Sequence, residues 1–204
     1  MLLDFGCGSS AFLDQARAHG WRTIGVDFHS DVVAAVRRNG HDAYLTGSDW
    51  LAAVPEQSVD LVRLNHVVEH LYQPGETLRQ LWTRLRPGGR LHLATPNAES
   101  WTFRLFRSRW FSLDAPRHIV LFSPRSLRGL LRRAGFQRVR CHHEVLTKDA
   151  ARSLGYWLED RQRVEAGSAA SLMHRADLAE ALFALARFAA LAGAADRFHV
   201  IAEK

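Results

Sequence analysis

The residues with the clearest chemical potential lie near the start of the chain, in the segment LLDFGCGSS at positions 2–10. Its apolar run, Leu2–Phe5, predicts a strand. Gly6 and Gly8 can adopt backbone angles closed to other residues, so that a ligand can approach the main chain closely. The helix expected over Ala11–His19 offers unpaired N–H groups at its start, which suit carboxylate or phosphate oxygens. This order of strand, glycine turn and helix predicts one wall of a cofactor site.

Acidic side chains follow or end the first three expected strands. Asp4 directly precedes the glycine turn, where it could accept a hydrogen bond from a ligand's ammonium group or order the turn. Asp27 ends the second apolar run, and its carboxylate can accept hydrogen bonds from both hydroxyls of a ribose; the alternative is a helix-entry role. In the segment Ser48-Asp49-Trp50, the acid could bind an adenine amino group and the indole could pack on the ring. These acids favour a nucleoside ligand.

Length and composition bound the class of protein. A chain of 204 residues, 47% hydrophobic and 24% charged, suits one globular domain with an appended subdomain. The net charge of +6 permits anionic partners but does not select among them, because arginines spread over helix faces are usually solvated. Cys7 and Cys141 lack metal-ligand spacing, so we expect no metal. No charged-then-apolar leader opens the chain, which favours a cytoplasmic protein.

The elements that must position these residues alternate along the chain. Short apolar runs alternate with helical patterns, which predicts an α/β fold with a doubly wound, mostly parallel sheet. Such sheets bind ligands at the carboxyl ends of their strands. We expect Ser30 to cap the second helix and Pro87-Gly88-Gly89 to turn the chain into the fifth strand. The strands are expected over Leu2–Phe5, Trp21–Asp27, Asp42–Thr46, Ser58–Leu64, Arg90–Thr95, Phe136–His142 and Phe198–Ala202.

A long helical pattern covers Ala150–Ala195, with a break near Ala166-Gly167-Ser168. Its most apolar part, Leu178–Ala195, is almost long enough to span a bilayer, but Glu180 and Arg187 interrupt it. We therefore expect a packed amphipathic helix and no transmembrane segment, with contact to a membrane surface as an alternative. The expected organisation is a core over 1–149, a helical insertion over 150–196 and a last strand over 197–204.

Four further stretches extend the pattern beyond the glycine turn: IGVDFHSD, SVDLVRLNHVVEHLYQP, LRPGGRLHLATPN and APRHIVLFSPRSLRGLLRRAGF. Together with LLDFGCGSS, they resemble the class I S-adenosylmethionine-dependent methyltransferases, in particular the branch that includes the ubiquinone-biosynthesis O-methyltransferases. The resemblance covers residues 1–142, and the final FHVIAEK resembles the last strand of that family. It implies a Rossmann-like methyltransferase fold with a seven-stranded sheet, an antiparallel last strand and a helical insertion before it.

The resemblance also implies a cofactor, S-adenosyl-L-methionine, whose product is S-adenosyl-L-homocysteine. The methyl group is already activated, so the protein mainly aligns an acceptor in a dry pocket. His66 would face the reaction side. His118 would line the acceptor pocket and act as base toward a hydroxyl, or anchor a loop instead. The expected cofactor-binding residues are Asp4, Gly6, Cys7 and Gly8 at the methionine end, Asp27 at the ribose, Phe28, Ser48, Asp49 and Trp50 at the adenine, and Asn65 through its backbone.

The favoured function is methyl transfer from S-adenosylmethionine to a small molecule, with a hydroxyl on an apolar or aromatic compound as the expected acceptor. Three alternatives stay open: a non-catalytic cofactor-binding or interaction module, a nucleic-acid methyltransferase, and an NAD-dependent dehydrogenase. Nucleic acid is not favoured as a partner, because the fourth strand ends in Asn65-His66-Val67-Val68 without the Asn/Asp-Pro-Pro-aromatic motif of base methylation. Members of the family usually carry a helix before the first strand, and none is expected ahead of Leu2. The oligomeric state is left open.

Overall fold

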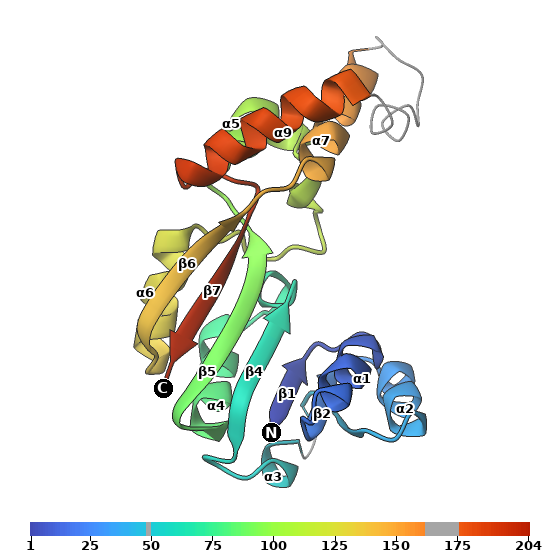
Figure 1. Cartoon of the computed structure of the whole chain (residues 1–204), viewed down its shortest axis with the longest axis vertical. Coiled ribbons are helices and arrows are strands. Elements are labelled where there is room, and N and C mark those ends of the chain that lie inside the picture. The colour runs from blue at the N-terminus through green and yellow to red at the C-terminus, as the bar shows by residue number, and fades with distance from the viewer. Residues whose placement is uncertain (48–49, 162–175) are drawn as a thin grey trace. The chain divides into compact units, whose positions relative to one another are not determined.

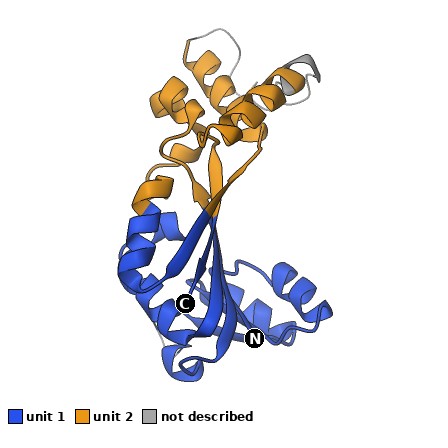
Figure 2. Cartoon of the chain, turned by 60° about the vertical axis from the view of Figure 1, so that its left-hand side comes forward, with its two compact units in different colours: residues 1–94, 127–140, 200–204 blue, residues 95–126, 141–199 orange. Residues whose placement is uncertain are grey.

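The computed structural model describes residues 1–47, 50–161 and 176–204, with side chains described from 180 onward in the last range. The chain divides into two compact units, coloured separately in Figure 2. The first comprises Met1–Ala94, Leu127–Arg140 and Val200–Lys204, and the second comprises Thr95–Ser126 and Cys141–His199. The first unit holds the glycine turn, and the second holds most of the helical segment near the C-terminus.

A seven-stranded sheet with the order β3-β2-β1-β4-β5-β7-β6 organises the chain (Figure 1). The strands are mostly parallel, and β7 runs antiparallel to its neighbours β5 and β6. This arrangement confirms the α/β, doubly wound fold expected from the sequence. The strands are β1 (Leu2–Phe5), β2 (Thr23–Asp27), β3 (Asp42–Leu45), β4 (Val59–Asn65), β5 (Leu85–Pro96), β6 (Gln137–Glu144) and β7 (Arg197–Glu203).

Helices cover both faces of the sheet in the first unit. The strands β2 and β3 lie on one side of β1 and the strands β4 and β5 lie on the other, so right-handed connections place their helices on opposite faces. The connections from β1 to β2 and from β2 to β3 place α1 (Ala11–Ala18) and α2 (Ser30–Arg38) on one face. The connection from β4 to β5 places α4 (Pro74–Arg84) on the other face, where a Cβ at Gly135 would lie 2.7 Å from the Trp82 ring. The remaining helices of this part are α3 (Trp50–Ala53), η1 (Val68–His70) and α6 (Pro124–Ala134).

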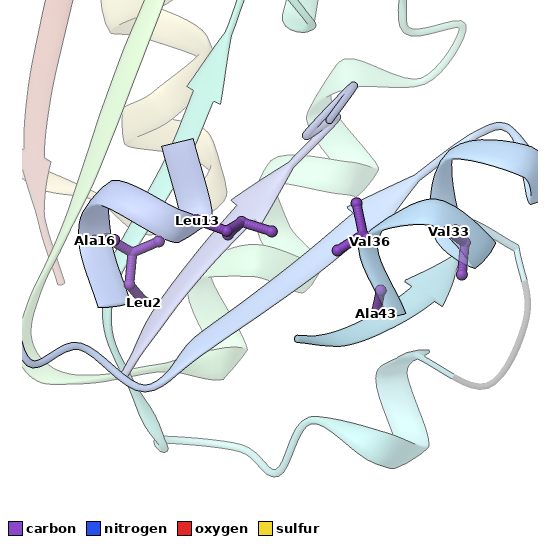
Figure 3. Packing of buried hydrophobic residues seen from close by; sticks show 6 residues of the cluster. All are labelled: Leu2, Leu13, Ala16, Val33, Val36 and Ala43. Carbon is purple, nitrogen blue, oxygen red and sulfur yellow. The ribbon is translucent and has the colours of Figure 1, made fainter. Parts of the chain in front are cut away.

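Buried aliphatic side chains fix α1 and α2 to the first strands. Six of them form one cluster, which Figure 3 displays: Leu2, Leu13, Ala16, Val33, Val36 and Ala43. Leu13 and Val36 are completely buried, so each contributes about 1.5–3 kcal/mol of transfer free energy. The cluster therefore holds the helix that follows the glycine turn in a fixed position relative to β1.

The parallel register brings the ends of the first strands to one edge of the sheet. Asp4 is aligned with Gly25 on β2 and with Arg63 on β4, and Asp27 is aligned with Leu45 on β3. Asp4, near the end of β1, and Asp27, at the end of β2, therefore both lie at the carboxyl edge, where α/β sheets bind ligands.

Two local predictions are wrong. Ser30 is the first residue of α2, while His29 occupies the cap position and makes no capping bond with its side chain. The segment Pro87-Gly88-Gly89 lies inside β5, which already begins at Leu85. There the register shifts from Val59–Leu85 to Leu61–Arg90, and Gly88 has a φ of 76°. The glycines therefore form a bulge within the strand, because a positive φ kinks the backbone while pairing resumes beyond it.

The second unit contains five helices among the described residues: α5 (Trp101–Phe106), η2 (Arg107–Arg109), η3 (Phe111–Leu113), α7 (Lys148–Asp160) and α9 (Ala176–Leu191). Leu182 of α9 packs with Ala150 and Ala151 of α7, against Trp101. No helix in the described part of the chain has the length and apolarity that crossing a membrane requires. The break expected near Ala166-Gly167-Ser168 lies outside the described residues.

A buried polar cluster ties α7 to the start of β7 in the second unit. Asp149 is fully buried and accepts hydrogen bonds from Arg197 Nε at 2.7 Å and Nη2 at 3.1 Å. Asp196 is also buried and accepts from the Thr102 hydroxyl and from Trp110 Nε1 at 3.4 Å. Burial and the nearby Asp149 charge raise the pKa of Asp196 to about 7. This carboxyl is therefore partly protonated at neutral pH.

Candidate cofactor site

The glycine turn adopts the conformation that its composition predicts. Gly6 and Gly8 have φ values of 74° and 62°, in the left-handed region that favours glycine. The N–H groups of Gly6 and Cys7 donate to the Val26 carbonyl oxygen at 2.7 and 3.2 Å, which ties the turn to β2. A Cβ at Gly6 would lie 2.4 Å from Val67 Cγ2, whereas a Cβ at Gly8 would meet nothing within 4 Å. The space over Gly8 is open to a ligand.

Asp27 braces this turn with both carboxylate oxygens. Oδ2 accepts from the Gly8 N–H at 2.8 Å, and Oδ1 accepts from the His29 N–H at 3.0 Å. The second bond gives Asp27 the helix-entry role that the sequence left as an alternative. Oδ2 also accepts a long contact from the Cys7 thiol at 4.0 Å. An ionised carboxylate offers about four lone-pair sites, so one site is unused and a second is occupied only by this weak thiol contact. Both ribose hydroxyls could therefore be held without breaking the turn.

Two aromatic side chains, Phe28 and Trp50, contact the Phe5 ring at the end of β1. Phe28 follows Asp27, is 45% exposed and contacts Phe5 edge to face, with ring centroids 5.8 Å apart. Trp50 contacts the same Phe5 ring at 5.6 Å but is only 3% exposed. Phe28 therefore presents an open ring surface that a base could use, while Trp50 packs within the protein. The adenine contact expected of Trp50 stays a prediction, and Ser48 and Asp49 lie outside the described residues.

Asp4 is completely buried and forms an ion pair that the sequence did not reveal. Arg63 Nη1 donates to Oδ1 at 2.9 Å and to Oδ2 at 3.0 Å. Burial raises the pKa of Asp4, and the Arg63 charge and hydrogen bonds oppose that shift. An arginine within the otherwise apolar stretch LVRL of β4 was the available indication, but its partner lies 59 positions away.

The side chain of Cys7 is half-buried in the glycine turn. Burial and the charges of Asp27 and Asp4 raise the pKa of its thiol to about 12. The thiol is therefore protonated at neutral pH, and the thiolate is the reactive form of cysteine. A Cβ at Gly25 would lie 3.1 Å from Cys7 Sγ, so the side chain fills the space between the turn and β2. These contacts favour a packing role for Cys7, and its expected contact with the cofactor stays a prediction.

Asn65 is the last residue of β4, and His66 directly follows it in the same unit. His66 has a φ of 56°, and its backbone N–H donates to the Ala94 carbonyl oxygen at 2.9 Å. Its ring Nδ1 lies 3.3 Å from Oε1 of Glu69, a carboxyl that is completely buried. A positive φ is uncommon outside glycine and marks a backbone held by its surroundings. The structure thus fixes the orientation of the His66 ring by a buried carboxylate.

His118, the other histidine expected near the reaction, belongs to the second unit. Its Nδ1 lies 2.8 Å from the Ser112 carbonyl oxygen, so this nitrogen carries the hydrogen, because a carbonyl can only accept. Nε2 is then the basic nitrogen of the neutral ring and lies 4.0 Å from Asp114 Oδ2. The first bond is the loop-anchoring contact that the sequence left as an alternative; a role as base stays a prediction.

The first unit therefore brings together a glycine turn, two acids and an exposed aromatic ring at the carboxyl edge of a parallel sheet. These groups fit a nucleoside cofactor with an amino-acid end: Asp27 matches the ribose hydroxyls, the Phe28 face matches the base, and the open space over Gly8 admits a ligand chain. The class of protein that this combination defines is a nucleoside-cofactor-binding α/β domain.

Comparison with known proteins identifies the family within this class of α/β domain. The family model described as "Methyltransferase domain" matches residues 1–141, and the chain belongs to this family. The cofactor expected from the sequence, S-adenosylmethionine, is confirmed at the level of the family. Among solved structures, an S-adenosylmethionine-dependent methyltransferase from Archaeoglobus fulgidus has the same fold, with a TM-score of 0.65 at 20% identity, covering 100% of this chain and 85% of that chain.

Two curated relatives illustrate the sequence similarity. A malonyl-(acyl-carrier protein) O-methyltransferase of Yersinia pestis is 31% identical over 125 residues, which are 61% of this chain and 46% of that protein. A ubiquinone biosynthesis O-methyltransferase of Aeromonas salmonicida is 26% identical over 103 residues, which are 47% of this chain and 43% of that protein. The chain thus spans less than half the length of either relative.

Proposed function

We propose that this chain transfers the methyl group of S-adenosylmethionine to a hydroxyl oxygen on a small apolar or aromatic acceptor. The observation that carries this proposal is the Asp27 carboxylate, which holds the turn at Gly8 and retains the capacity to bind two hydroxyls. The O-methyltransferase names of the two relatives support an oxygen acceptor. A cytoplasmic location remains an expectation of the sequence, as does the alternative of contact with a membrane surface.

Each part of the site has a defined task in this proposal. When bound, the cofactor supplies an activated methyl group on a sulfonium. Gly6 and Gly8 let its chain approach the backbone, Asp27 binds the ribose, and Phe28 packs on the adenine. His66 or His118 accepts the proton that the acceptor hydroxyl loses as its oxygen gains the methyl group. The protein thus contributes orientation and a base rather than covalent chemistry.

Calorimetric titration with S-adenosylhomocysteine tests the cofactor assignment. We expect the wild-type protein to bind this product, and Asp27→Asn to weaken binding by about tenfold or more, because it replaces charge-assisted hydrogen bonds by neutral ones. Asp31→Asn is the matched control: it removes an acid four positions away, on the exposed start of α2. Binding of NAD in place of S-adenosylhomocysteine, or equal affinity of wild type and Asp27→Asn, would contradict the proposal.

The acceptor is identified by a separate experiment. Purified protein is incubated with labelled S-adenosylmethionine and panels of phenols, quinol precursors, lipids, small acids and nucleic acid, and methylated products are measured by mass spectrometry. Turnover of phenolic or other apolar hydroxyl compounds supports the proposal, and methylated nucleic acid would contradict it. Cofactor binding without turnover of any acceptor would favour the alternative of a non-catalytic module.

A further inference from the structure

Arg63 occupies a position that the proposed function has not yet used. It lies on β4 in register with Asp4 on β1, and its guanidinium is held from two sides. Asp4 accepts two hydrogen bonds from Nη1, and the guanidinium carbon lies 3.9 Å from the centroid of the Phe12 ring. Phe12 belongs to the first turn of α1, which directly follows the glycine turn. Arg63 is therefore immobilised beside the turn.

The guanidinium keeps donors for a further partner. Both hydrogen bonds to Asp4 use the single nitrogen Nη1, whereas an arginine carries five N–H donors on three nitrogens. The side chain is 20% exposed, so part of the group faces solvent. A planar guanidinium with its position already fixed matches a carboxylate well, because two parallel N–H···O bonds can form at little entropic cost.

The two acids at the turn oppose a carboxylate at this place, so a cation beside them is needed to accept one. Asp4 and Asp27 are both buried, and the Asp27 charge acts on Asp4 in the direction opposite to Arg63. A carboxylate brought to this place by a ligand would add a further negative charge. Arg63 is the cation within hydrogen-bond distance of Asp4, and it offsets that repulsion at the methionine end of the proposed site.

We propose that Arg63, fixed by Asp4 and Phe12, binds the carboxylate of the amino-acid end of S-adenosylmethionine. This inference rests on the proposed function and adds a specificity residue to it. Asp4 acts through Arg63 as a positioning residue for the carboxylate. The arrangement distinguishes the complete cofactor from nucleosides that lack the amino acid.

A binding cycle between the protein and the ligand tests this contact. The ligands are S-adenosylhomocysteine and its analogue that lacks only the carboxylate, and the proteins are wild type and Arg63→Met, compared by calorimetry. We expect wild type to bind the complete ligand about tenfold or more tightly than the analogue, the range of one charged hydrogen-bonded contact. In Arg63→Met this preference should disappear, because the variant affects only the ligand that has a carboxylate.

Several outcomes would overturn the inference. A preference for the carboxylate that survives in Arg63→Met would assign its recognition elsewhere. An equal loss for both ligands would make Arg63 a structural residue only. Tighter binding of both ligands by the variant would mean that Arg63 competes with the ligand ammonium for Asp4. If wild type binds neither ligand, the proposed function itself fails, and this inference fails with it.

Three further variants control for unfolding and for the loss of a positive charge. Arg63→Met leaves the buried Asp4 without its partner, so Asp4→Asn/Arg63→Met is measured in parallel, which removes both charges. This pair should also show no preference for the carboxylate. Arg63→Lys should restore part of the preference, because it keeps the charge but not the planar fork. Arg90→Met, on β5 in an exposed ion pair with Glu203, is the matched control and should keep the full preference.

Discussion

At the scale of single residues, the structure separates two glycines that the sequence treats alike. Gly6 and Gly8 both have positive φ, but only at Gly6 would a Cβ collide with a neighbour, because it would lie 2.4 Å from Val67 Cγ2. Gly8 instead faces open space and donates its N–H to Asp27. Gly6 therefore serves packing, and Gly8 leaves the open space that the proposed function assigns to the cofactor.

A substitution at Gly6 tests this division. Gly6→Ala should lower the free energy of unfolding by more than the roughly 1–2 kcal/mol that a left-handed backbone costs a residue with a Cβ, because the added methyl group also collides with Val67. Gly20→Ala is the control: its φ is 82°, yet its Cβ would meet nothing within 4 Å. Urea unfolding of both variants measures the difference. Equal destabilisation would show that the Val67 contact has no energetic weight.

At the scale of elements, the sequence predicts strands better than the connections between strands. Each of the first strands is an apolar run that ends near an acid or a glycine, so Leu2–Phe5 was located without error. The cap at Ser30 was wrong because side-chain type alone does not determine where the helical angles begin. The turn expected at Pro87-Gly88-Gly89 was wrong because a glycine pair in sequence is compatible both with a turn and with a bulge inside a strand.

Two leucines of helix α9 differ strongly in burial, so we expect them to contribute differently to stability. Leu182 is 7% exposed and packs against Ala150 and Ala151, whereas Leu185, one turn further along, is 51% exposed. We expect Leu182→Ala to lower the free energy of unfolding by about 2–3 kcal/mol, since it removes buried methyl groups and leaves a cavity. Leu185→Ala should change it by less than about 0.5 kcal/mol. Chemical denaturation followed by circular dichroism gives both values, and equal losses would reject this packing of α9.

At the scale of the whole molecule, the sequence does not predict which charged residues far apart in the chain form ion pairs with each other. The residues themselves located the glycine turn and Asp27, and the resemblance implied a seven-stranded sheet, whereas the Asp4–Arg63 pair depends on β1 and β4 being adjacent in the sheet. The same holds for the cluster of Asp149, Asp196 and Arg197, whose members lie almost 50 residues apart at the extremes. A charged residue in an apolar stretch indicates that a partner exists, but only the topology identifies it.

The pH dependence of stability follows from one such buried group. Asp196 has Oδ2 without a hydrogen-bond partner in the described structure, and its pKa is raised from 3.8 to about 7, first by burial and then by Asp149. Between these two pH values the folded protein retains a proton that the unfolded chain has released. The contribution of Asp196 to stability is therefore fully present below pH 3.8 and is lost as the pH rises through about 7.

Asp196→Asn isolates this contribution from the other groups that titrate in the same range, which include 11 histidines. The amide keeps an oxygen that can accept from Thr102 and Trp110 but carries no charge at any pH. We expect the free energy of unfolding of wild type, measured relative to that of the variant, to fall between pH 5 and pH 7 and to level off above pH 8. A difference that stays constant or rises over this range would mean that Asp196 is already ionised in the folded protein, stabilised by Arg197 despite its burial.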